Sequence, residues 1–146
     1  MNNLNYVEIK YYNNTKNSSA VKSKQIANLY LDSNLVHNIW NKDERSLFIL
    51  KMPGDSMDGG ETPIINNDML IVDTSSRDIS CSGIYAYTTN DENFIFVNGI
   101  MLNVDGSVRV LFYNKKYSEI KYTQAELDKV NFKIIGRVIK NMSSLD

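Results

Sequence analysis

A serine in a glycine-containing turn is the residue whose setting most suggests chemistry. Ser56 lies in the run Pro53-Gly54-Asp55-Ser56-Met57, directly after the apolar segment Leu47–Leu50. A proline and a glycine before a serine allow a tight turn that presents the hydroxyl at the edge of a sheet. Backbone N–H groups beyond such a turn, including that of Met57, can stabilise an oxyanion. On turn chemistry alone an ordinary loop is the simpler interpretation, and a nucleophile is the alternative.

Other reactive side chains are few. The chain has one cysteine, Cys81, and one histidine, His37, which excludes a disulfide framework, multi-cysteine zinc patterns and most histidine-cluster metal sites. We expect His37 to be a partly buried structural residue and Cys81 a structural thiol. Asp55, Asp68 and Asp73 are predicted to bond turns and strand ends rather than a metal. The sequence therefore predicts neither a metal nor a cofactor.

Length and composition describe one soluble domain. The chain has 146 residues, of which 42% are hydrophobic and 23% charged, and a domain of this size folds without disulfides. The net charge of -1 argues against a generally basic nucleic-acid-binding surface. No apolar run approaches the ~18 residues of a membrane span, and the start MNNLNYVEIK lacks the basic and apolar regions of a signal peptide. We expect a cytoplasmic protein without membrane contact.

The elements that must position Ser56 are mainly β-strands. Apolar, aromatic and β-branched runs bounded by turn residues predict strands at Tyr6–Tyr12, Leu47–Leu50, Met69–Val72, Ile84–Thr88, Asn93–Val97 and Phe132–Ile139. Asp105-Gly106 predicts a hairpin turn before Val108–Val110, because this dipeptide tolerates positive φ. Met52, Met57 and Met69 alternate with apolar neighbours and are predicted to fill the core.

Helical and irregular segments are expected to be short. Thr123 and Glu126 predict a capping box that begins a helix, and Lys22–Leu31 is predicted to hold a short helical turn. Asn13–Ser19 is polar without periodicity and predicts a linker. We therefore expect a mostly β fold of curved, antiparallel sheets with one or two short helices.

Several short motifs, in their order along the chain, resemble the LexA-type self-cleaving peptidase domain, the family of LexA, the lambdoid phage repressors and the UmuD mutagenesis proteins. The resemblance extends from about Leu47 to Lys140 and rests on Gly54-Asp55-Ser56-Met57, Asn67–Asp73, Ser82-Gly83-Ile84-Tyr85, Asp105-Gly106-Ser107, Asn114–Tyr117 and Ile135–Val138. It implies curved sheets of the LexA C-terminal-domain type. It also implies that residues 1–22 are an N-terminal strand and a remnant of the cleavage linker, and that residues 23–146 are the peptidase and dimerisation domain.

The resemblance implies a role for Ser56 and exposes a missing partner. In this family the serine attacks a peptide bond of its own chain, and the base is a lysine whose pKa is lowered by burial. Counting back from Asp105-Gly106-Ser107 places that lysine at Asn98 and its neighbouring arginine at Gly99. Since an amide is not a useful base, we predict a peptidase fold whose self-cleavage is lost or impaired.

Neither the other lysines nor the upstream sequence restores the reaction. Lys51 is predicted to be a solvated strand residue, and Lys115, Lys116 and Lys121 are predicted to be surface charges. Family members cut after a small residue, usually in Ala-Gly or Cys-Gly. The region upstream of Ser56 contains neither dipeptide and offers only Ser19-Ala20-Val21 and Ala27-Asn28.

The dipeptide Asn98-Gly99 supports two interpretations. Taken alone it is a standard hairpin turn between Phe94–Val97 and Ile100–Leu102. The resemblance favours a continuous strand with a bulge at Gly99.

The resemblance implies the C-terminal regulatory and dimerisation domain of a phage-type or LexA-like transcriptional repressor. We expect a homodimer that pairs through Phe132–Lys140. The chain contains no helix-turn-helix pattern, so DNA contact is expected only through a separate head. One alternative is a stand-alone UmuD-like accessory protein of the DNA-damage (SOS) response, which Asp58-Gly59-Gly60 supports. Another is an active serine peptidase that uses a different base. A recombinase filament is a candidate partner.

Overall fold

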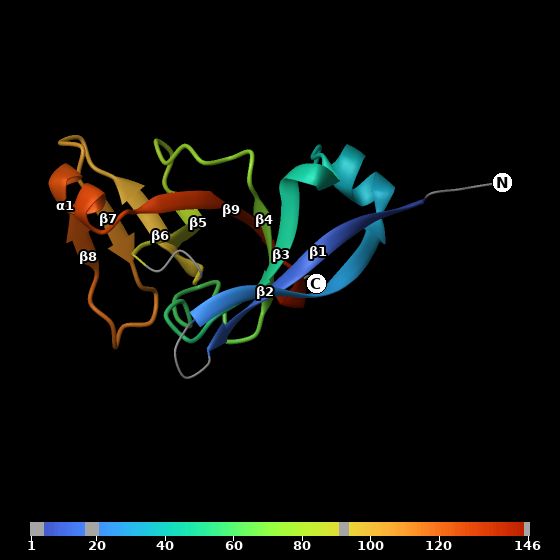
Figure 1. Cartoon of the computed structure of the whole chain (residues 1–146), viewed down its shortest axis with the longest axis horizontal. Coiled ribbons are helices and arrows are strands. Elements are labelled where there is room, and N and C mark those ends of the chain that lie inside the picture. Colours follow the sequence, from blue (N-terminus) through green and yellow to red (C-terminus); the bar gives the residue numbers. More distant parts are fainter. Residues whose placement is uncertain (1–4, 17–20, 91–93, 145–146) are drawn as a thin grey trace.

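The computed structural model of this chain describes residues 5–16, 21–90 and 94–144 (Figure 1). Its strands join one sheet in the order β2-β1-β3-β4-β9-β5-β6-β7-β8. Neighbouring strands are antiparallel except β1 and β3, which are parallel. The strands are β1 (Tyr6–Lys16), β2 (Val21–Asp32), β3 (Leu47–Lys51), β4 (Met69–Asp73), β5 (Gly83–Thr88), β6 (Phe96–Leu102), β7 (Val108–Leu111), β8 (Ile120–Tyr122) and β9 (Lys133–Asn141).

Helical segments are short, so the predicted mostly β fold is confirmed. The α-helix α1 (Gln124–Lys129) has six residues and begins with the predicted capping box of Thr123 and Glu126. The other helical segments are single turns: η1 (Leu35–Ile39), η2 (Glu44–Ser46) and η3 (Met142–Ser144). In the part of the chain that the structure describes, no helix is long and apolar enough to cross a membrane.

Strand β9 joins the two halves of the sheet. Its first half pairs with β5 and its second half with β4, and both ladders contain a register shift. Figure 1 shows β9 running from the side of β5–β8 toward the side of β1–β4. Gly136, at this crossing, allows the close approach of β4, because a Cβ there would lie 2.4 Å from the Asp73 carbonyl oxygen.

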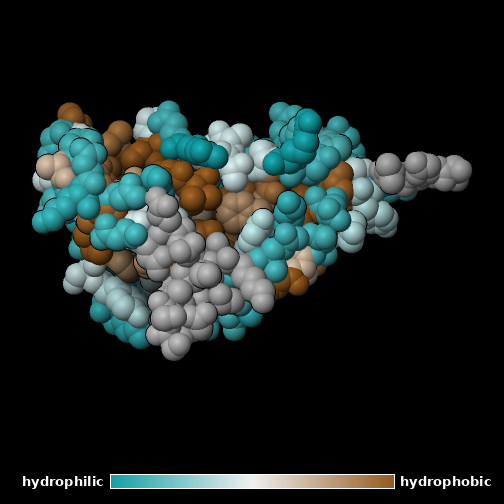
Figure 2. Space-filling model, in the orientation of Figure 1, coloured by the Kyte–Doolittle hydropathy of each residue, from teal (hydrophilic) through white to brown (hydrophobic). Residues whose placement is uncertain are grey.

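Three hydrophobic clusters hold the sheet together. The first contains Met52 and Met57 below the Ser56 turn, as predicted. The second packs β1, β3 and β4 against Val36 of η1, and the half-buried Met69 contacts it. The third contains Tyr85, Tyr87 and the inner residues of β6 and β7. Figure 2 shows hydrophobic side chains gathered in the middle of one face, over β9 and its neighbours.

The prediction of a helical turn at Lys22–Leu31 is wrong, because this segment is strand β2. It pairs with β1 from Val21↔Lys16 to Asp32↔Tyr6, with one register shift beside Tyr11. This pairing gives the backbone of β2 hydrogen-bond partners on β1 along its whole length, whereas a single helical turn would satisfy only a few of its backbone groups. The predicted linker is also partly wrong, since Asn13 to Lys16 belong to β1. The rest of that linker lies outside the described residues, and the domain division at residue 22 stays a prediction.

The hairpin-turn interpretation of Asn98-Gly99 is wrong, because both residues lie inside β6. Asn98 pairs with Tyr85, and Gly99 pairs with Ile84 on one side and Leu111 on the other. The continuous strand that the resemblance favours is therefore confirmed, but its register passes Gly99 without a shift, so there is no bulge there. A Cβ at Gly99 would be tight, since it would lie 3.3 Å from both the Leu111 Cβ and the Tyr113 hydroxyl, and these side chains would have to shift slightly.

Candidate active site

The Ser56 turn is built from local bonds that follow β3. The Met52 N–H donates to the Asp68 carbonyl at 2.7 Å and the Met52 carbonyl accepts from Asn67 N–H at 3.0 Å, which extends the β3–β4 pairing. The chain then reverses at Gly54, whose φ of 97° favours glycine. The Gly54 N–H donates to the Asn66 side chain at 2.9 Å. The turn therefore leaves the end of β3 in a defined direction.

The segment Asn114–Tyr117 holds this turn from the other side. The Asn114 N–H donates to the Ser56 carbonyl at 3.1 Å, and its side-chain amide donates to the Asp55 carbonyl at 3.0 Å. Lys116 Nζ lies 2.8 Å from one carboxylate oxygen of Asp55, and the Tyr117 hydroxyl donates to the other at 2.6 Å. Four contacts thus join two segments that lie almost sixty residues apart in the sequence.

Asp55 and Lys116 stabilise each other's charged forms. The hydrogen bond from Lys116 lowers the pKa of the Asp55 carboxyl most, and the hydrogen bond from Tyr117 lowers it further. The same pair raises the pKa of Lys116. Lys116 therefore stays protonated beside Asp55 and is unsuited to take a proton from Ser56.

Asn98 lies beside Ser56 and is only 2% exposed. Its Oδ1 accepts a hydrogen bond from the Tyr87 hydroxyl at 2.6 Å, and its Nδ2 donates to the Leu111 carbonyl at 3.3 Å. Burial raises the pKa of Tyr87, so the phenol stays neutral and donates. The position that the resemblance assigns to the base is therefore occupied by a neutral amide whose oxygen and nitrogen both have partners.

Ser56 has a weak hydrogen bond and is followed by a buried residue. Its Oγ donates to the Val97 carbonyl at 3.5 Å, one residue before Asn98. Met57 buries its side chain completely, and its carbonyl accepts from the Ile64 N–H at 3.0 Å. The oxyanion role of the Met57 N–H and the nucleophilic role of Ser56 stay predictions.

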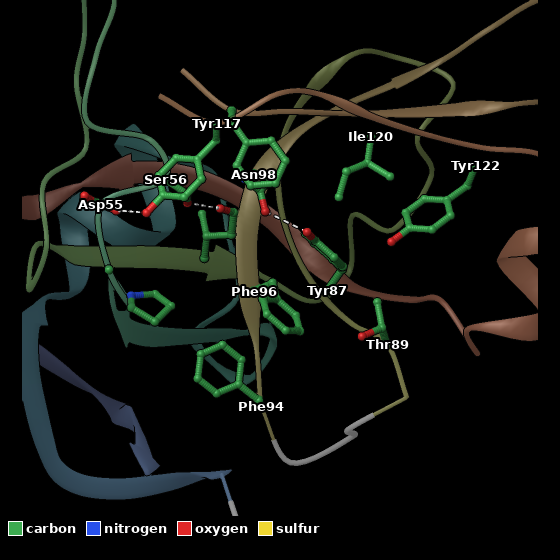
Figure 3. Close-up of a pocket in the computed structure, with 14 residues that line it drawn as sticks. Asp55, Ser56, Tyr87, Thr89, Phe94, Phe96, Asn98, Tyr117, Ile120 and Tyr122 are labelled. Atoms are coloured by element: carbon green, nitrogen blue, oxygen red, sulfur yellow. Dashed lines mark hydrogen bonds between the residues drawn. The ribbon is translucent and has the colours of Figure 1, made fainter. Parts of the chain in front are cut away.

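A cleft of about 400 Å³ opens beside Ser56. Figure 3 shows Ser56, Asn98 and Tyr87 in a row, with Phe94 and Phe96 beneath them. The described residues that line the cleft include no lysine, arginine or histidine, and their one charged member is Asp55. They are Pro53, Gly54, Asp55, Ser56, Tyr87, Thr89, Phe94, Phe96, Val97, Asn98, Phe112, Tyr117, Ile120 and Tyr122.

The lysines that could replace a base do not line this cleft. Lys51 is half-buried at the end of β3, where it pairs with Met69. Lys115, Lys116 and Lys121 are exposed, as expected for surface charges. Lys121 Nζ lies 4.0 Å from Asp105.

The remaining predicted residues have structural partners. Asp68 accepts from the Ile65 N–H and from the Asn141 amide. Asp73, fully buried, accepts from Ser75 and contacts Lys42 Nζ at 2.8 Å. Both aspartates therefore bond turns and strand ends, as expected. Within the described ranges no three potential ligands cluster as a metal site.

The prediction for His37 is partly wrong, and Cys81 is exposed. His37 is exposed rather than partly buried and lies 2.6 Å from Glu44. The short segment η1 buries Val36 and leaves His37, Asn38 and Ile39 exposed.

Sequence reasoning missed the aromatic side chains that line the cleft and the hydrogen bond from Tyr87 to Asn98. Tyr87 and Phe96 stack with ring centroids 5.6 Å apart, and Phe94 lies 4.6 Å from Phe96. The density of aromatic residues before and within β6 was the available indication. Of the upstream dipeptides, Ala27-Asn28 lies inside β2, whereas Ser19-Ala20-Val21 extends outside the described residues.

Comparison with known protein families places most of the chain in a family. A family model described as Peptidase S24-like matches residues 12–139. No curated protein matches the chain significantly. The family match covers both the Ser56 turn and β6.

Proposed function

Because the chain belongs to the peptidase S24-like family, that of LexA, UmuD and the phage repressor C-terminal domains, we propose that it is a regulatory domain with lost or impaired self-cleavage. In this proposal it is the cytoplasmic, C-terminal dimerisation domain of a phage-type or LexA-like transcriptional repressor. The observation that carries the proposal is the buried amide of Asn98, at the position that the resemblance assigns to the base, which is bonded to Tyr87 and Leu111.

The absence of a base is expected to lower the rate of self-cleavage greatly. A positioned general base contributes about 10²–10⁴-fold to rate, and removing one member of a nucleophile–base unit removes most of the advantage of the unit. The Ser56 hydroxyl has its ordinary, very weak acidity unless a nearby group accepts its proton. The cleft offers Asn98, a neutral Tyr87 and a carboxylate, Asp55, that is already bonded to Lys116 and Tyr117.

Dimerisation through Phe132–Lys140 is part of the proposal and takes a specific form. Strand β9 pairs with β5 through its first half and with β4 through its second half. In this proposal, contacts to a second copy use side chains of β9. Half-buried Ile135 and Val138, on the strand beneath the hydrophobic patch of Figure 2, support this form. DNA would be bound by a separate helix-turn-helix head, and pairing two heads raises operator affinity.

The Asp58-Gly59-Gly60 run does not favour the UmuD-like alternative, because Gly59 has a packing reason. A Cβ at Gly59 would lie 2.3 Å from the Tyr113 carbonyl oxygen. Either member of the family could need a glycine there. An in-frame helix-turn-helix of about 65–80 residues upstream in the gene, a common size for a small DNA-binding domain, would favour the repressor.

The test is self-cleavage of the longest natural chain at alkaline pH, with and without an activated recombinase filament. We expect no Ser56-dependent fragment by mass spectrometry. A fluorophosphonate that labels activated serines should react with Ser56 no faster than with ordinary exposed serines. A fragment that disappears in Ser56→Ala would overturn the inactive site and favour a peptidase that uses another base.

A further inference from the structure

Asn14 of β1 bonds both backbone groups of Ile95, a residue 81 positions away in the sequence. Its Nδ2 donates to the Ile95 carbonyl at 2.8 Å, and its Oδ1 accepts from the Ile95 N–H at 3.0 Å. A carboxamide presents a donor and an acceptor side by side. Asn14 therefore gives Ile95 the pair of bonds that a residue on a neighbouring strand would give it.

Ile95 needs such a partner because it lies just outside the ladders of β6. Pairing with β5 extends to Phe96↔Tyr87, and pairing with β7 extends to Gly99↔Leu111. Ile95 itself is 8% exposed, and buried backbone groups are costly when they lack hydrogen bonds. The Asn14 side chain satisfies both groups where the sheet does not.

The position of Asn14 follows from the packing of β1. Strand β1 pairs with β3 through Lys10–Tyr12, and its later residues extend beyond that ladder. Tyr12 packs edge-on against Phe48 and joins the cluster that contains Ile95. Alternate residues of a strand share a face, so Tyr12 directs Asn14 toward Ile95.

The residues on either side of Ile95 form one wall of the Ser56 cleft. Phe94 and Phe96 both line it, with ring centroids 4.6 Å apart. Phe96 stacks on Tyr87, and Tyr87 donates to Asn98. A continuous series of contacts therefore leads from the β1–β2 hairpin to the residue beside Ser56.

We propose that Asn14 is a positioning residue of the cleft: its carboxamide acts as a strand partner for Ile95 and thereby sets the aromatic wall formed by Phe94 and Phe96. The hairpin is then coupled to the shape of the cleft through one side chain. This role concerns the wall and is independent of whether Ser56 cuts.

Hydrogen exchange and NMR of the full chain test this role. In Asn14→Ala we expect the Ile95 amide to exchange about fivefold faster or more, since a net hydrogen bond is lost. We also expect the ring resonances of Phe94 and Phe96 to shift. The matched control is Asn28→Ala on the same hairpin, an exposed residue whose side chain accepts from Gln25, and it should change neither. Unchanged rings, or faster exchange throughout the hairpin without a local maximum at Ile95, would overturn the proposal.

The isosteric variant Asn14→Asp separates this role from simple loss of stability. A carboxylate accepts from the Ile95 N–H but cannot donate to its carbonyl, whereas a protonated carboxyl can do both. The protection factor of Ile95 should therefore rise as the pH falls through the ordinary range of an aspartate pKa, near 4. Asn28→Asp provides the background at each pH. Protection that does not rise relative to this control would refute the assignment.

Discussion

The Ser56 turn and the Asn98 segment of β6 lie next to each other but differ in how their functional positions are occupied. The turn has the glycine, the serine and the clamp from Asn114–Tyr117 that hold its hydroxyl at the cleft. In β6 the position that the resemblance assigns to the base holds a buried amide bonded to Tyr87. The first region thus presents a serine hydroxyl at the cleft, and the second has the hydrogen bonds of a structural core.

This difference follows from what each region does for the fold. The turn connects β3 to β4 and contacts a segment far along the chain, so its geometry is part of the packing. A lysine in β6 would be a single buried cation, and burying an unpaired charge is costly. Asn98 instead satisfies Tyr87 and the Leu111 carbonyl. Both regions therefore have structural reasons for their geometry that do not depend on whether Ser56 has a base.

The largest expected effect is a gain of serine reactivity in Asn98→Lys. A lysine buried at this position should have a lowered pKa, which a general base requires. We expect fluorophosphonate labelling of Ser56 at alkaline pH to rise by about 10²-fold or more. Labelling avoids the need for a cleavable dipeptide. The double variant Ser56→Ala/Asn98→Lys is the control. A folded Asn98→Lys protein that labels at the natural rate would show that the turn does not hold a nucleophile.

The second effect is on stability, in Asn98→Ala. This change removes one buried and one partly buried hydrogen bond and leaves the Tyr87 hydroxyl unpaired, so the free energy of unfolding should fall by about 2–3 kcal/mol. Urea denaturation measures it. Asn38→Ala, on the exposed surface of η1, should stay within about 0.5 kcal/mol of the natural chain. If the two variants behaved alike, the structural account of Asn98 would be wrong.

A smaller effect is expected at the clamp, in Asn114→Ala. Its side chain donates to the Asp55 carbonyl in a partly buried bond and accepts from the Lys116 N–H in an exposed one, so we expect a loss of about 1 kcal/mol in the free energy of unfolding. Amide exchange should rise at the turn around Ser56 and remain unchanged in β6. Faster exchange in both places would mean that the two regions unfold as one unit and would contradict their separation.

The smallest effect is a pH dependence from Asp55. Its pKa is lowered in the folded chain by Lys116 and Tyr117, so its contribution is fully present above the unfolded value, about 4. It is lost as the pH falls through the lower folded value. In Asp55→Asn the difference in stability from the natural chain should therefore shrink as pH falls below about 4. A difference that grows in acid would reverse the sign that we assign.

Much of the turn could be predicted from local sequence, whereas its surroundings could not. Pro53-Gly54 requires a bend at a residue with positive φ, and Thr123 with Glu126 forms a capping box within four residues. Such features depend on groups close together in the chain. The clamp from Tyr117 and the bond between Asn14 and Ile95 join residues 62 and 81 positions apart, and no local pattern specifies which distant partner they meet.

By itself the sequence determined the strands that flank Ser56, the hairpin at Asp105-Gly106, the absence of a lysine at position 98 and a resemblance that the family match confirms. These depend on residue type, short spacing and motif order. Only the tertiary structure decided that residues 21–32 form a strand and that Asn98-Gly99 continues β6. A dipeptide that favours a turn and a segment without clear periodicity both become strands here, because pairing with a neighbour satisfies a whole row of backbone groups.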